Sequence, residues 1–191
     1  MKSPSAAVFF CLLSACVTRQ PDHFYILSAQ PPGTSAARTM PVTQATLKVT
    51  LPSLVDRAQI VLNTSADGIL VQEHERWAAP LTDLVTQTLA QDIERRRGDV
   101  LIAGGLNRSG GAAINVTVDI VQMTARRGER ASIETHWRIL DARTGKDQVG
   151  SDIFSTPLGQ DGNAGVANAG VARALSECLA LLAERLVGQM P

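Results

Sequence analysis

The chain has 191 residues with 18 basic and 18 acidic side chains, so its formal net charge is zero. A neutral chain lacks the surplus of positive charge that is typical of nucleic-acid-binding proteins, which argues against that class of partner. The length fits a single domain with a substantial core, and aliphatic residues must build that core because aromatic residues make up only 4% of the chain.

The N-terminus has the pattern of a lipoprotein signal peptide. Lys2 supplies a positive charge, and an apolar run over residues 6–13 follows it. The run is shorter than the roughly 20 residues that a membrane span needs. Two small residues then precede Cys16, and this ending resembles the bacterial lipobox, whose cysteine is acylated. We therefore predict a signal peptide over residues 1–15 and lipidation of Cys16; the alternative is an ordinary secretory signal that happens to end beside a cysteine.

Acylation of Cys16 would anchor the protein without a transmembrane helix, because each buried CH2 contributes about 0.8 kcal/mol and two chains give stable binding. The covalent acyl and diacylglycerol groups on Cys16 are the only attached groups that we expect, and residues 16–22 would form the tether. In lipoproteins of this kind, an aspartate after the cysteine commonly causes retention at the inner membrane. Val17 stands at that position, which implies the periplasmic face of the outer membrane.

Cys178 is then the only cysteine of the mature fold, since Cys11 leaves with the signal peptide. An internal disulfide is therefore excluded even in an oxidising compartment. Cys178 lies in an Ala- and Leu-rich helical pattern, which favours a small buried hydrophobic side chain over a reactive thiol.

The first half of the mature chain reads as short strands followed by a helix. Strands are expected at 24–27, 47–51, 60–62 and 69–71, and the last two should form a hairpin around the turn at 66–68. Three prolines and a glycine predict a loop over 30–41.

An amphipathic helix is predicted to start near Trp77 and to end before Gly98. Apolar residues recur every three or four positions over 81–93, and Pro80 suits a first turn. The three arginines at 95–97 match the negative end of the helix dipole; a patch for lipid headgroups or a partner is the alternative.

The second half contains longer strands and a long final helix. Strands are expected at 100–102, 114–120, 133–139 and 148–154, with a hairpin turn at 126–129, and the helix is expected over 163–187. The glycine-rich segment 104–111 does not predict a phosphate loop, since neither Gly-Lys-Ser/Thr nor a helix follows it. This order predicts one α+β domain over 23–191, with two main helices packed on one face of an antiparallel β-sheet.

The sequence contains no constellation that indicates catalysis or metal binding. The three histidines, His23, His74 and His136, lack metal-ligand spacing and read as surface or interface imidazoles. The nucleophile motif Gly-x-Ser-x-Gly is absent. Glu73 and Glu75 lie close together near the predicted helix start and read as solvated or capping residues. We predict no catalytic residue, no metal site and no enzymatic activity.

Four sequence blocks, in order along the chain, carry a family resemblance. They are the lipobox ending at Cys16, Phe24-Tyr25-Ile26-Leu27, Leu51-Pro52 with Asp56-Arg57-Ala58-Gln59-Ile60-Val61, and Arg76-Trp77-Ala78-Ala79-Pro80-Leu81. Together they resemble the PqiC-like family (paraquat-inducible protein C), also called ABC-type transport auxiliary lipoproteins. Two positions depart from the family pattern: Phe24 replaces the first tyrosine of Tyr-Tyr-x-Leu, and Ala58 replaces a proline.

The resemblance implies a non-catalytic, lipid-anchored periplasmic subunit of a transport system built around MCE (mammalian cell entry) domain proteins. Such systems are thought to move lipids between the two membranes and to maintain envelope integrity. The implied partners are an MCE-domain protein and the lipid of the outer membrane. The sequence leaves open whether the protein forms a homo-oligomer. Two alternatives stay open as well: an assembly or secretion-complex lipoprotein of the outer membrane, and a lipid-binding carrier with an apolar cavity.

Asp56, Arg57, Arg76 and Trp77 are the predicted partner-binding residues, because they combine charge with apolar surface in the way that interface anchors do. The alternative is a structural role for this set. Trp77 would then fasten the helix start to the sheet, and Asp56 would pair with Arg57 or Arg76.

Overall fold

The computed structural model describes residues 20–31, 37, 42–103, 112–159 and 164–191. These residues form eight strands and two helices, and the α+β class is confirmed. In chain order they are β1 (His23–Tyr25), β2 (Thr43–Thr50), β3 (Gln59–Asn63), β4 (Ile69–Trp77), α1 (Leu81–Arg96), β5 (Val100–Ile102), β6 (Ile114–Ala125), β7 (Arg130–Asp141), β8 (Asp147–Pro157) and α2 (Ala164–Gln189).

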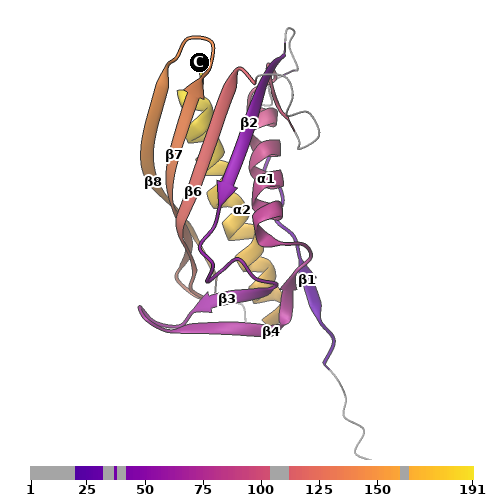
Figure 1. The fold of residues 1–191 in the computed structure, drawn as a ribbon. Coiled ribbons are helices and arrows are strands. Elements are labelled where there is room, and N and C mark those ends of the chain that lie inside the picture. Colours follow the sequence, from indigo (N-terminus) through magenta and orange to yellow (C-terminus); the bar gives the residue numbers. More distant parts are fainter. Residues whose placement is uncertain (1–19, 32–36, 38–41, 104–111, 160–163) are drawn as a thin grey trace, which may run out of the picture.

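A five-stranded sheet with the order β5-β2-β6-β7-β8 forms the main layer, and both helices lie on one of its faces (Figure 1). The antiparallel β6-β7-β8 meander follows the predicted hairpins. The prediction of a wholly antiparallel sheet is wrong, because β2 runs parallel to both β5 and β6. Side-chain alternation shows which face of a strand is buried, but it carries no information on strand direction.

A second sheet of three strands, β1-β4-β3, lies across one end of the main sheet and the helices (Figure 1). The β3–β4 hairpin was predicted, and it is confirmed by the antiparallel register that pairs Asn63 with Ile69. β1, the first described strand, runs parallel to β4 with His23 opposite Glu75 and Tyr25 opposite Trp77. The start of the folded domain is therefore attached to the body through β4.

The predicted boundary between β4 and α1 is wrong by several residues. Trp77 ends β4 and does not begin the helix, which starts at Leu81 after the N-cap residue Pro80. The length of β4 was underestimated because the last two buried residues of the strand are Glu75 and Trp77. A buried acidic residue interrupts the apolar alternation by which a half-buried strand is recognised.

The core between the sheets and the helices is aliphatic, as the composition required. The final helix buries an apolar face that includes Val171, Leu175, Cys178, Leu182 and Leu186. Burial also raises the pKa of the Cys178 thiol, in agreement with the predicted hydrophobic role. None of the helices that the structure describes is long and apolar enough to cross a membrane.

Candidate functional site

The segment that carries Asp56 and Arg57 is fixed by a turn after β2. The backbone N–H groups of Val55 and Asp56 both donate to the carbonyl of Pro52, at 3.1 Å each. Val55 is buried and anchors this turn, whereas the two charged residues that follow it are exposed. The Trp77 N–H then donates to the carbonyl of Ala58 at 2.7 Å, which places the segment beside the end of β4.

The same segment reaches the N-terminus of α1. Pro80 provides no side-chain cap for this helix. The carboxylate of Asp56 lies 3.4 Å from the backbone N–H of Thr82 in the first turn. A carboxylate at this end of a helix is stabilised by the free N–H groups and by the helix dipole. Asp56 thus helps to position the start of α1 while its side chain remains exposed.

Asp56, Arg57 and Trp77 line one surface pocket together with Ala58, Pro80 and Leu81. The lining combines apolar residues with this charged pair. Trp77 is only 5% exposed, so most of its ring belongs to the core, as the structural alternative required. Three of the four predicted partner-binding residues therefore come together, and their role in binding stays a prediction.

Arg76 is separated from this pocket. Its Nη1 atom lies 3.3 Å from the Asp22 carboxylate, and His74 Nδ1 lies 3.0 Å from the other oxygen of the same group. The alternative in which Asp56 pairs with Arg76 is therefore wrong. The pKa of Asp22 is lowered, mainly by the hydrogen bond from His74.

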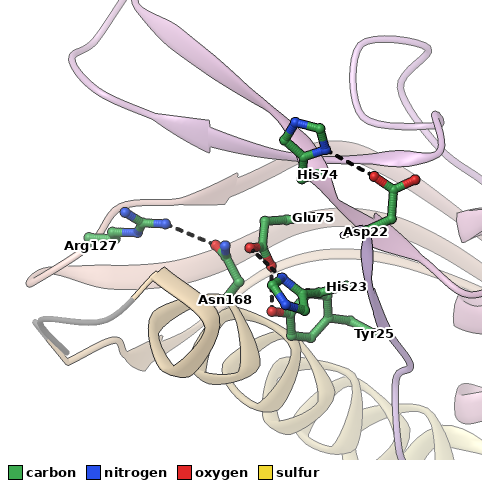
Figure 2. A network of polar contacts seen from close by, with 7 residues as sticks. All are labelled: Asp22, His23, Tyr25, His74, Glu75, Arg127 and Asn168. Atoms are coloured by element: carbon green, nitrogen blue, oxygen red, sulfur yellow. Dashed lines mark hydrogen bonds and ion pairs between the residues drawn. The ribbon is translucent and has the colours of Figure 1, made fainter. Parts of the chain in front are cut away.

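A second polar cluster surrounds Glu75, whose side chain points from β4 toward β1 and α2 (Figure 2). The prediction that Glu75 is solvated or a capping residue is wrong, because it is 5% exposed. The Tyr25 hydroxyl donates to one carboxylate oxygen, and His23 Nδ1 lies 3.1 Å from the other. Since a carboxylate only accepts, this nitrogen of His23 carries the hydrogen.

The electrostatics of the cluster keep Glu75 ionised at neutral pH. Burial alone raises the pKa of Glu75, but hydrogen bonds from Tyr25 and His23 outweigh burial and lower it. Burial and the hydrogen bond to Glu75 raise the pKa of Tyr25 to about 12, so this hydroxyl keeps its proton. Asn168 in turn accepts from Arg127 at 3.0 Å, which joins α2 to the turn between β6 and β7.

We call the two carboxylates Asp22 and Glu75, with their partners His23, Tyr25, His74 and Arg76, the β1 clasp. It secures β1 on β4 by side-chain bonds in addition to the short ladder of three residue pairs. The sequence signal that was missed is the two-residue spacing of His23 and Tyr25, which places both side chains on one face of β1. Among the residues that the structure describes, no group of three or more His, Cys, Asp or Glu side chains could hold a metal ion.

The fold recurs in solved structures of low sequence identity. A crystal structure of an uncharacterized protein is similar with a TM-score of 0.71 and 13% identity over 90% of this chain and 100% of that chain. A protein from Xanthomonas campestris is similar with a TM-score of 0.64 and 17% identity over 87% of this chain and 93% of that chain. A search of curated proteins finds no match.

These similarities define the class of fold, a small α+β domain, and nothing more. The family follows from the sequence model of the ABC-type transport auxiliary lipoprotein component, which matches residues 25–187. The chain belongs to this family, in agreement with the resemblance drawn from the four sequence blocks.

Proposed function

We propose that this chain is the lipid-anchored periplasmic subunit of an MCE-type intermembrane lipid transport system, and that it docks an MCE-domain protein at the outer membrane. The observation that carries the proposal is the pocket at the start of α1, where the exposed Asp56 and Arg57 lie beside an apolar lining that Ala58, Ala79 and Pro80 present to solvent. An apolar centre with a charged edge is the usual composition of a protein-binding surface. Family membership supports a transport role, and the cluster at Glu75 fastens β1 to β4.

The lipid anchor is the second part of the proposal. The lipobox ending at Cys16 and the valine after it support acylation and an outer-membrane location. Cys16→Ala should therefore release the protein from the membrane fraction into the soluble periplasmic fraction. Membrane association that persists in the unacylated variant would contradict the anchor.

We prefer docking over carriage of lipid because the cavity between the sheets and the final helix is small. The cavity between β3, β6 and α2, lined by Val61, Met123 and Val171 among others, has a volume of about 10 Å³. That is the space of roughly one water molecule, so this cavity is too small for an acyl chain. The larger hollows that the described residues line, of about 410–500 Å³, are open to the surface.

The partner is tested by crosslinking and pull-down from envelopes, using a charge reversal at the edge of the pocket. Arg57→Glu should reduce recovery of the MCE-domain protein about tenfold, the equivalent of about 1.4 kcal/mol, because fewer than a third of interface residues cost more than about 1 kcal/mol when they are replaced. Lys146→Glu is the matched control, since Lys146 is an exposed cation in the turn before β8. Equal recovery with both variants would contradict the assigned surface. Recovery of an assembly or secretion complex with the wild-type protein, without an MCE-domain protein, would contradict the proposed system.

A further inference from the structure

Two large apolar side chains are exposed immediately after the tether. Phe24 is 63% exposed and Ile26 is 60% exposed. Their neighbours His23 and Tyr25 point toward Glu75 (Figure 2), and because side chains alternate along a strand, Phe24 faces the other way. Ile26 directly follows the end of β1. A folded protein usually buries such residues or uses them in a contact.

These side chains border a groove whose second wall is α2. Ala169, Ala172 and Arg173 line that wall, and Ser28 continues the first wall beyond Ile26. The Ser28 N–H donates to Ser176 Oγ at 3.1 Å, so the segment after β1 is fastened to α2. The β1 clasp fastens its other end, and the two attachments make the groove a rigid part of the body.

The length of the tether determines which surface the groove meets. Phe24 lies eight residues after Cys16, a distance of at most about 29 Å for a fully extended chain. An acyl group on Cys16 would therefore keep the groove close to the membrane surface, where even a weak contact becomes intramolecular and well populated.

We propose that Phe24, Ile26 and Arg173 form a membrane-facing patch that rests on the leaflet holding the Cys16 anchor. The two apolar side chains would enter the boundary between headgroups and acyl chains, and the exposed Arg173 would meet lipid phosphates. Asp22, at the end of the tether, is already paired with His74 and Arg76, which reduces its repulsion of anionic lipid. The proposal rests on the proposed acylation of Cys16 and adds a fixed orientation of the body on the membrane.

The experiment uses the mature protein, acylated at Cys16, in vesicles of phosphatidylethanolamine and phosphatidylglycerol that contain a nitroxide-labelled lipid. Phe24→Cys and Val149→Cys each receive an environment-sensitive fluorophore. Val149 is the matched control, because it is a 73% exposed apolar residue on β8, which lies on the opposite side of the molecule from β1 (Figure 1). Cys178 is fully buried and should not react with the label.

The label at position 24 should show blue-shifted emission and several-fold stronger quenching by the nitroxide lipid than the label at position 149. Arg173→Glu should reduce that quenching. Water-like emission at both positions would overturn the patch. A label at position 24 that is shielded from water but not quenched by lipid would also overturn it, in favour of a protein occupant. Mass spectrometry of Cys16 accompanies each sample, so a missing acyl group, which would overturn the anchor itself, is distinguished from a failed patch.

Discussion

Glu75 is the residue whose replacement tests the β1 clasp most directly. It is buried at the junction of β1, β4 and α2, and it accepts hydrogen bonds from Tyr25 and His23. Hydrogen bonds to a charged group contribute about 1.5–3 kcal/mol each when one partner is removed, and bonds within one cluster are not additive. We therefore expect Glu75→Ala to reduce the free energy of unfolding by about 3 kcal/mol, which corresponds to a decrease in Tm of roughly 6–12 °C for a domain of this size.

The isosteric replacement separates charge from shape. Glu75→Gln keeps an oxygen that accepts from Tyr25 but removes the negative charge, so its cost should be smaller, about 1–2 kcal/mol. The ionised form of Glu75 is favoured in the folded protein because its pKa is lowered from the ordinary value of 4.5. Its contribution to stability is therefore complete above that value and is lost as the pH falls through the lower folded pKa. Glu75→Gln should reduce the slope of stability against pH in this acidic range.

Thermal and urea denaturation of the mature protein measure these changes, with Glu73→Ala as the control. Glu73 lies two residues earlier on the same strand and is exposed, so its replacement should change stability by less than about 0.5 kcal/mol. Faster hydrogen exchange of β1 in Glu75→Ala would locate the loss at the clasp. Equal stability of the Glu73 and Glu75 variants would refute the reasoning.

Three further experiments test the packing of the core and of the main sheet. Trp77→Ala should cost about 3–5 kcal/mol by urea denaturation, because the ring is almost fully buried; unchanged stability with loss of partner capture would instead assign Trp77 to the interface. Gly150→Ala should cost about 1–3 kcal/mol, because a Cβ there would lie 2.2 Å from Trp137 Cζ2, whereas Gly188→Ala, which meets nothing within 4 Å, should not destabilise the protein. Cys178 should resist alkylation until the protein unfolds, since burial raises the pKa of its thiol; rapid alkylation of the native protein would contradict its placement.

The sequence predicted the long elements well because each carries its own periodicity. β6 and β7 alternate over most of their length, and α2 has an apolar stripe that is wide enough to cover the sheet. The parallel pairing of β2 with β5 and β6 was not predicted, since it joins segments separated by a hairpin and a helix. Such pairing depends on how distant parts of the chain pack together, and no local pattern records it.

The same distinction applies to the candidate site. Asp56, Arg57 and Trp77 were selected from two separate blocks, and the structure brings these blocks together in one pocket. Arg76 is adjacent to Trp77 in sequence but faces Asp22, because neighbouring residues of a strand point to opposite faces. Glu75 was misjudged for a related reason: its partners His23 and Tyr25 lie on a strand 50 residues away that pairs only in the folded state.

The C-terminal end of β4 connects the tether to the proposed docking pocket within three consecutive residues. Glu75 and Arg76 hold β1, the strand that follows the tether, and Trp77 lines the pocket beside Asp56 and Arg57. The backbone bond from Trp77 to Ala58 links the same strand to the charged segment. Force applied between a membrane anchor and a partner in the pocket would therefore act across a short, hydrogen-bonded path and would largely bypass the main sheet.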